Sequence, residues 1–270
     1  MMNNQYLALF QLHRPPFVSD IRHSDILVTD AIKGVEKRIQ YGVGLGAVVL
    51  VTGDIGSGKS TALRYVAIKF HSSEYRVIHV VASTGSILEL YRQILGALDL
   101  DPSGTSRTAM TRRIKQEIKD TVQNKKKKIL LIIDEASLLR LEVFTELHTL
   151  TQFESDSKPY LPMVLSGQAN LLDNLQYRYA MPLASRVVGR CHLQGVDRQG
   201  MEAYLMHHLT IAGAANSPFD DTAMTAIHQG SGGLFRKANH LARGALVVAA
   251  QKKSHTVTAE HVRHAASELL

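Results

Sequence analysis

The most informative segment of the sequence is Val51-Thr-Gly-Asp-Ile-Gly-Ser-Gly-Lys-Ser60, which contains the spacing G-x-x-x-x-G-K-[ST]. It follows the apolar run Ala47–Val51 and precedes a helix-like stretch, Thr61–Phe70, so the strand, loop and helix that this motif requires are all present. The glycines let successive backbone N–H groups point into one concavity, and the helix N-terminus adds a partial positive charge. The sequence therefore predicts a phosphate-binding loop rather than a chance glycine-rich turn.

The loop residues have distinct expected roles toward ATP. We expect Lys59 to reach the β- and γ-phosphates and Ser60 to present its hydroxyl oxygen to Mg²⁺. The residues predicted to bind the nucleotide and its metal are Gly53, Asp54, Ile55, Gly56, Ser57, Gly58, Lys59, Ser60, Thr61 and Asp134.

A second acidic motif follows the buried run Ile129–Ile133, which leads directly into Asp134 and Glu135. Asp134 would hold Mg²⁺ together with Ser60, directly or through water. Glu135 would accept a proton from an attacking water, and the Asp-Glu pair favours ATP hydrolysis over a small-molecule kinase. The alternative is two solvated acids at the end of a strand.

Continuous apolar runs recur along the first two thirds of the chain and alternate with amphipathic stretches. Further strands are predicted at Arg76–Val81 and Pro162–Leu165. Such runs indicate a parallel α/β sheet that is covered on both faces. After Val196 only helical patterns remain. We predict an α/β nucleotide-binding domain at residues 1–195, with an extended segment and a helix in residues 1–45, and a small all-helical lid at 196–270.

Four polar residues outside these motifs are candidates for the same site. Gln168 ends the fourth strand and would contact the γ-phosphate or orient the water. Arg186 follows a short helix near the edge of the sheet and would reach the nucleotide of a neighbouring subunit, with Arg190 as the alternative. Arg236 opens a helix, where a cation opposes the helix dipole, and would fold back onto the γ-phosphate. The alternatives are that Gln168 is an ordinary turn residue and that the arginines are ordinary surface residues.

Taken together, these motifs resemble those of the AAA+ ATPases over nearly the whole chain. In that resemblance, residues 129–135 are Walker B, Gln168 is sensor 1, Arg186 is the arginine finger and Arg236 is sensor 2. The branch that the chain resembles most is the ExeA-type, or secretion-pathway protein A-like, branch. The stretches that carry this likeness are Pro16-Phe17, Val51–Ser60, Leu165–Gln168 and Ser185–Leu193.

The resemblance implies two possible uses. One is secretin assembly, by ATPases that continue into a membrane span and a peptidoglycan-binding region. The other is transposition, by short ATPases resembling the Mu B and Tn7-type target selectors, which polymerise on DNA and recruit a transposase. Length and charge favour the second use, so the expected partners are double-stranded DNA, a transposase or other recombination protein, and further copies of the chain in a ring or helical filament. The alternative is a protein-remodelling ATPase of a secretion pathway that does not bind DNA directly.

Composition limits the compartment and the class of protein. Hydrophobic residues make up 45% and charged residues 20% of the 270, which excludes wholesale disorder. A single cysteine, Cys191, excludes an intramolecular disulfide. No apolar run approaches the roughly 18 residues that span a bilayer, and the N-terminus lacks the pattern of a secretory signal. We expect a cytoplasmic protein with no membrane partner.

The positive charge of the chain is concentrated in one segment, Arg107–Lys128, with nine Lys or Arg and two acids. In it, Met110, Ile114, Ile118 and Val122 form an apolar helical stripe, and basic residues fall on another face. The residues predicted to bind duplex DNA are Ser103, Thr105, Arg107, Arg112, Arg113, Lys115 and Lys119. The alternative is a solvated basic face. The absence of Trp and the 6% of aromatic residues argue against a platform for single strands.

Overall fold

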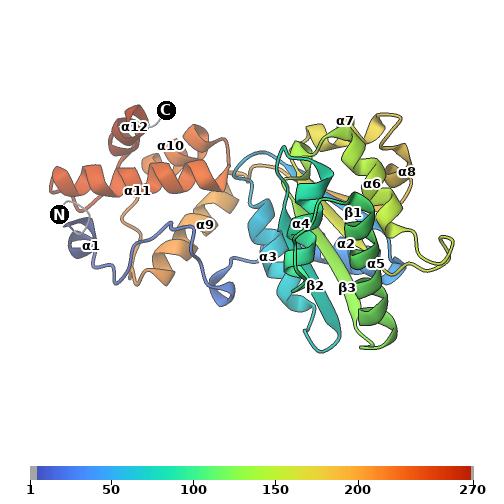
Figure 1. Cartoon of the computed structure of the whole chain (residues 1–270). Helices are drawn as coiled ribbons and strands as arrows, with labels where there is room; N and C mark the ends of the chain where they lie inside the picture. Colours follow the sequence, from blue (N-terminus) through green and yellow to red (C-terminus); the bar gives the residue numbers. More distant parts are fainter. Residues whose placement is uncertain (1–4, 269–270) are drawn as a thin grey trace. The chain divides into compact units, whose positions relative to one another are not determined.

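In the computed structural model, which describes residues 5–268, the chain divides into two compact units (Figure 1). The α/β unit consists of Thr29–Gly53 and Lys59–Leu193. The helical unit consists of the described residues up to Val28, the loop Asp54–Gly58, and the chain from Gln194 onward.

The α/β unit contains one parallel sheet, as the sequence predicted, and it has five strands where four apolar runs had been identified. The strands are β1 (Val48–Gly53), β2 (Tyr75–Val81), β3 (Lys128–Asp134), β4 (Met163–Gly167) and β5 (Val187–Leu193). Their order across the sheet is β2-β3-β4-β1-β5, and every pair is parallel. The carboxyl ends of all the strands therefore lie at the same edge, where ligands bind in sheets of this kind.

Helices surround this sheet and supply the apolar side chains that cover it. They are α2 (Asp30–Leu45), α3 (Lys59–Lys69), α4 (Ile87–Ala97), α5 (Arg107–Gln123), α6 (Leu141–Thr151), α7 (Asn170–Gln176) and α8 (Met181–Ala184), with the 3-10 turn η3 (Ala136–Leu138) after β3.

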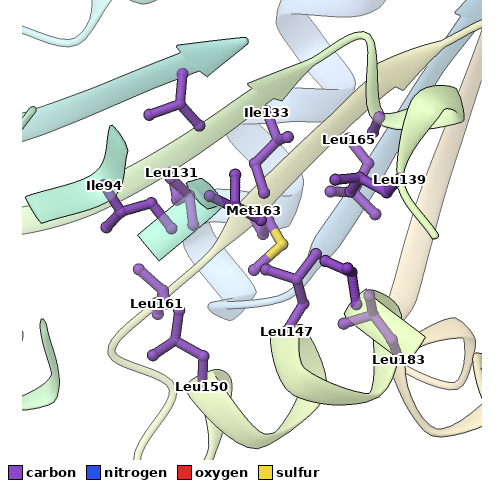
Figure 2. Close-up of a cluster of buried hydrophobic side chains, with 14 of the residues drawn as sticks. Ile94, Leu131, Ile133, Leu139, Leu147, Leu150, Leu161, Met163, Leu165 and Leu183 are labelled. Atoms are coloured by element: carbon purple, nitrogen blue, oxygen red, sulfur yellow. The ribbon is translucent and has the colours of Figure 1, made fainter. Parts of the chain in front are cut away.

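Two separate hydrophobic clusters account for the continuous apolar strands. In β1, Leu50 joins a cluster with α4, α5 and α6, and part of this cluster is shown in Figure 2. The neighbouring Val49 and Val51 point to the other face, where they pack with residues of α2 and α3. Because both faces are covered, every residue of β1 is buried, and the strand has no alternating polar pattern.

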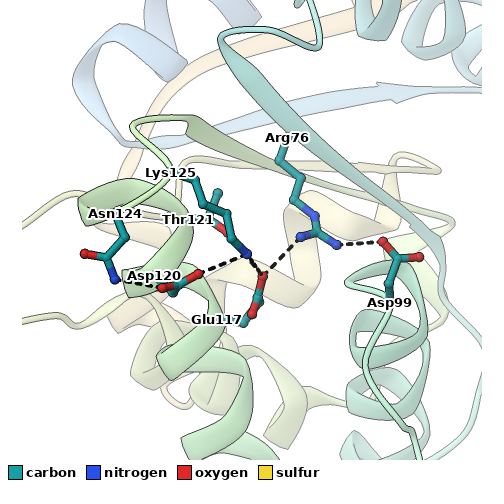
Figure 3. A network of polar contacts seen from close by, with 7 residues as sticks. All are labelled: Arg76, Asp99, Glu117, Asp120, Thr121, Asn124 and Lys125. Carbon is teal, nitrogen blue, oxygen red and sulfur yellow. Dashed lines mark hydrogen bonds and ion pairs between the residues drawn. The ribbon is translucent and has the colours of Figure 1, made fainter.

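Helix α5 is held to the sheet by a network of ion pairs on one side (Figure 3). Arg76 of β2 donates to Glu117 at 3.1 Å and to Asp99 at 2.9 Å. Lys125 lies 2.9 Å from both Glu117 and Asp120. The two acids of the Arg107–Lys128 segment are thus engaged by Arg76 and Lys125, and they do not offset the cations elsewhere on α5.

The helical unit contains the elements that the sequence predicted after residue 196 and also the start of the chain. Its helices are α1 (Gln5–Leu9), α9 (Arg198–Ile211), α10 (Asp221–Ser231), α11 (Phe235–Gln251) and α12 (Ala259–Ser267), with the 3-10 turn η2 (His23–Asp25). No helix among residues 5–268 combines the length and the apolar character needed to cross a membrane.

The N-terminal segment is grouped differently in the structure and in the prediction from sequence, which placed residues 1–45 with the α/β domain. The structure groups the segment before Thr29 with the helical unit and leaves only α2 with the sheet. The reason is that Tyr6, Leu12 and Phe17 are buried in the hydrophobic cluster of α9–α12. The Phe17 ring lies 5.7 Å from the ring of His208 and 6.1 Å from that of Phe219.

Candidate functional site

The phosphate-binding loop leaves β1 at Gly53 and enters α3 at Lys59. Gly56 has a φ of 86°, a conformation that residues with a side chain rarely adopt. A Cβ at Gly56 would also lie 2.8 Å from the Cβ of Arg236. Glycine at this position is therefore required both by the backbone and by the space around it.

Ser57 provides an observation on ligand binding that the sequence could not supply. Its side chain is 4% exposed, and its Oγ has no hydrogen-bond partner among the described residues. A buried hydroxyl without a partner is costly, and proteins tolerate it mainly where a ligand completes the bond. A phosphate oxygen in the loop would accept this hydrogen bond, so Ser57 fits a bound nucleotide.

The sheet side of the site brings together three polar residues that the sequence singled out. Lys59 is 6% exposed, and its Nζ donates to the Gly53 carbonyl at 2.9 Å. The Ser60 hydroxyl donates to Oδ2 of Asp134 at 2.7 Å. A hydroxyl and a carboxylate at this spacing are hard oxygen donors of the kind that Mg²⁺ takes, along with phosphate oxygens and water. The donor set therefore fits the predicted metal.

Glu135 has an unusual backbone conformation at the end of β3. Its φ and ψ are 54° and 30°, in the left-handed region, and its N–H donates to Oδ1 of Asp134 at 2.9 Å. Residues other than glycine adopt this region at a cost, and such residues cluster at functional sites. The side chain is half-buried.

Gln168 follows β4, the strand next to β3, at the same edge of the sheet. Its N–H donates to the Ser137 hydroxyl at 3.2 Å. A Cβ at Gly167 would lie 2.8 Å from the Ser137 nitrogen, so glycine permits the close approach of η3 to the end of β4. Ser137, which sequence reasoning missed, thus ties the segment after Glu135 to Gln168.

Arg236 lies at the start of α11, and its side chain is exposed. Its backbone N–H donates to the Gly56 carbonyl at 3.3 Å, so within the helical unit α11 begins against the phosphate-binding loop. Contact of its guanidinium with a nucleotide stays a prediction.

Arg186 is engaged within its own subunit. Its Nη2 lies 2.5 Å and 2.6 Å from the two carboxylate oxygens of Asp156, and its Nε donates to Nδ1 of His148 at 3.2 Å. Burial and the adjacent Arg186 lower the pKa of His148, which keeps the ring neutral and able to accept this bond. The hydrogen bonds from Arg186 likewise lower the pKa of Asp156. Arg190 is instead exposed on β5, opposite Leu50.

The predicted DNA-binding residues border a groove of about 500 Å³ between α5 and α6. Its lining includes the cations Arg107, Arg112, Lys115 and Lys119 and the acids Glu146 and Glu154. Arg107 pairs with Glu146 at 2.8 Å, and Lys119 lies 4.0 Å from Glu154. The sequence indicated the cations, but it gave no signal for the two acids opposite them.

The other residues of the predicted DNA site lie outside this groove lining. Arg113 is half-buried. The N–H of Ser103 donates to Asp101 at 2.9 Å, and the Ser103 hydroxyl bonds to the same carboxylate. Thr105 is exposed in the loop before α5. The structure thus brings Arg107, Arg112, Lys115 and Lys119 together and leaves Ser103, Thr105 and Arg113 apart from them.

Comparisons with known proteins agree with the fold and the loop. Residues 45–175 match the family model described as "AAA domain". Over 266 residues the chain is 27% identical to the general secretion pathway protein A of Aeromonas hydrophila, covering 98% of this chain and 48% of the relative. The chain therefore spans about half the length of that relative.

Several solved structures share the fold at low sequence identity. The Cdc6p protein of Pyrobaculum aerophilum has a TM-score of 0.72 at 14% identity and covers 98% of this chain and 71% of its own. The ORC1 protein of Aeropyrum pernix, in complex with DNA, has a TM-score of 0.72 at 17% identity. The match covers 94% of this chain and 68% of the ORC1 chain. The RuvB Holliday junction branch migration motor of Thermotoga maritima has a TM-score of 0.55 at 16% identity. The match covers 90% of this chain and 70% of the RuvB chain. These likenesses show an AAA+ P-loop fold.

Proposed function

We propose that this chain, an ATPase with an AAA domain at residues 45–175, binds double-stranded DNA as an ATP-dependent oligomer and regulates DNA transposition. The assembly would be a ring or helical filament of identical subunits that selects a target and recruits a transposase or another recombination protein. The observation that carries the proposal is the groove between α5 and α6, where four cations gather on an ATPase unit.

Nucleotide hydrolysis would use the residues at the carboxyl edge of the sheet. Lys59 would bind the β- and γ-phosphates, and Ser60 and Asp134 would hold Mg²⁺, which neutralises phosphate charge when bound. Glu135 would accept the proton of the attacking water, and Gln168 would contact the γ-phosphate or orient that water.

Two arginines would complete the site. Arg186 would stabilise transition-state charge on the nucleotide of a neighbouring subunit, with Arg190 as the alternative. Arg236 would contact the γ-phosphate, which its place beside Gly56 supports. Hydrolysis would then occur only at subunit interfaces, because one catalytic cation comes from a second copy.

Duplex DNA would bind through its backbone at the groove. Phosphates would compete with Glu146 and Glu154 for the groove cations, and Arg112 is exposed on the same helix face. Burial and the neighbouring Lys119 lower the pKa of Lys115, and a phosphate beside it would raise that pKa again. Such contacts release counterions and carry little sequence information. The likeness to the ORC1 protein, whose structure is a complex with DNA, and to the RuvB Holliday junction branch migration motor supports a nucleic-acid partner.

A second candidate function is an assembly ATPase of a secretion pathway that does not bind DNA directly. It is favoured by the relative described as general secretion pathway protein A, which is similar over 98% of this chain. This function predicts ATP hydrolysis that does not respond to DNA.

Binding of labelled duplex DNA across a salt series separates the two functions. With ATP and Mg²⁺, we expect the logarithm of the affinity to fall steeply with the logarithm of the salt concentration. Replacing Arg112, Lys115 and Lys119 together by Gln should weaken binding and reduce the slope by about 0.9 for each phosphate contact that is lost. Fluorescence anisotropy measures both quantities.

The matched control is Lys125→Gln with Lys127→Gln, because Lys125 pairs with Glu117 and Asp120, and Lys127 donates to the Ser72 carbonyl at 2.9 Å. A slope that is the same in the groove variant and in this control would contradict DNA binding at the groove. If the original protein itself does not bind duplex DNA tightly, and the two variants do not either, the result would favour the secretion function.

A further inference from the structure

A short turn between α6 and β4 has a backbone that is rare for residues with side chains. Glu154, Ser155 and Asp156 have φ values of 47°, 55° and 68°, so three consecutive residues lie in the left-handed region. Conformations of this kind persist only where the surroundings fix them. Here the Ser157 hydroxyl donates to the Glu154 carbonyl at 2.7 Å, and the preceding Phe153 is buried at 2% exposure.

The two acids of this turn bind different parts of the α/β unit. Glu154 accepts from Nε2 of Gln123 at 3.1 Å and lies 4.0 Å from Lys119, so it is attached to α5. Asp156 holds the Arg186 guanidinium through both of its carboxylate oxygens. The turn therefore connects the basic groove to Arg186.

We propose that Asp156 is a positioning residue that retains Arg186 within its own subunit, and that the left-handed turn links this retention to the groove. With Nε on His148 and Nη2 on Asp156, Arg186 must exchange these bonds before it contacts another subunit's nucleotide. A duplex that draws Lys119 away from Glu154, which lies 4.0 Å from it, leaves the bond from Gln123 to hold Glu154 to α5, and we expect this weaker attachment of the turn to favour release of Arg186. The inference rests on the proposed role of Arg186 at a neighbouring site.

If the ion pair between Arg186 and Asp156 only stabilised the fold, removing it would lower the melting temperature; its exposure argues against such a role. The side chain of Asp156 is 45% exposed and that of Arg186 is 25% exposed, and pairs in contact with water contribute little to stability. Loss of the carboxylate charge should therefore leave the melting temperature nearly unchanged. The readout that matters is the protein concentration at which ATP hydrolysis reaches half of its maximum.

The test is Asp156→Asn, assayed for ATP hydrolysis over a range of protein concentrations with and without duplex DNA. Without the Asp156 carboxylate, Arg186 should reach a neighbouring subunit more readily. We therefore expect the protein concentration at which ATP hydrolysis is half-maximal to fall about two- to fivefold. DNA should stimulate this variant less than the original protein, and Asp156→Glu should restore the original profile. Glu154→Gln should also reduce the stimulation by DNA.

The control is Asp120→Asn, which removes a carboxylate paired with Lys125 instead of Arg186. If Arg186→Ala hydrolyses ATP at the original rate, the proposed role of Arg186 fails. If Arg186→Ala is inactive but Asp156→Asn behaves like the control or is less active, the positioning inference fails and the proposed function stands. If Asp156→Asn gains activity while Glu154→Gln leaves the stimulation by DNA unchanged, the link to the groove is overturned. The double variant Asp156→Asn with Arg186→Ala should be as inactive as Arg186→Ala alone.

Discussion

Replacing Glu135 by Gln should reduce ATP turnover by about a hundredfold or more while ATP still binds. The amide keeps the size and the hydrogen-bonding reach of the side chain but cannot accept a proton from water. Lys59, Ser60 and Asp134 are unchanged, so nucleotide affinity should be retained. Phosphate release measures turnover, and titration with a fluorescent ATP analogue measures binding. Because nucleotide persists in the site, the assembly should also become more stable, which size-exclusion chromatography detects.

A suitable control for this variant is Glu142→Gln, which alters an exposed acid at the start of α6. Turnover should be the same as in the original protein. If Glu135→Gln hydrolysed ATP at the original rate, Glu135 would not be the base. If it lost ATP binding, the residue would instead support the structure of the nucleotide site.

Replacing Arg186 by Ala should reduce turnover by about a thousandfold or more, because no cation would then reach the neighbouring nucleotide in the transition state. ATP binding by each subunit should persist. A mixture of Arg186→Ala and Glu135→Gln subunits should regain activity. In mixed assemblies, the intact Glu135 of an Arg186→Ala subunit can face the intact Arg186 of a Glu135→Gln neighbour. Steady-state hydrolysis across mixing ratios measures this recovery.

Recovery on mixing is the outcome that a purely structural role for Arg186 cannot produce. If mixing never restored hydrolysis, the contribution of this arginine across the interface would be contradicted. If Arg190→Ala were inactive and complemented Glu135→Gln while Arg186→Ala remained active, Arg190 would be the acting residue. Its exposure on β5 leaves it accessible for that role.

The sheet could be predicted because its central strands β1, β3 and β4 are buried on both faces, and this requires continuous apolar runs such as Ile129–Ile133. The contact of Ser60 with Asp134 was also expected from sequence. The phosphate-loop motif places Ser60 at the start of α3, the acidic motif places Asp134 at the end of β3, and both were predicted to hold the same Mg²⁺. No signal in the sequence indicates that the segment before Thr29 packs with the helical unit, because the partners of Tyr6 and Phe17 lie about two hundred residues away in the chain.

Other parts of the site depend on tertiary packing that no local pattern encodes. The orphaned hydroxyl of Ser57 and the left-handed backbone of Glu135 appear only when the loop is folded. The cations of α5 were predictable, but the acids that oppose them come from α6 and the turn after it. In the same way, Asp156 is 30 residues from Arg186 in the chain, so the ion pair leaves no sequence signal.

In the proposed function, residues Gly53–Ser60 hold the phosphates of ATP, and Asp134 and Glu135 act on them. A crystal structure with Mg²⁺ and a non-hydrolysable ATP analogue would show whether these residues bind the nucleotide. We expect the phosphates in the loop, with Ser57 Oγ donating to one of their oxygens, and a metal ion between Ser60 and Asp134. A nucleotide bound elsewhere, or bound in the loop with both acids remote from its phosphates, would contradict this proposal.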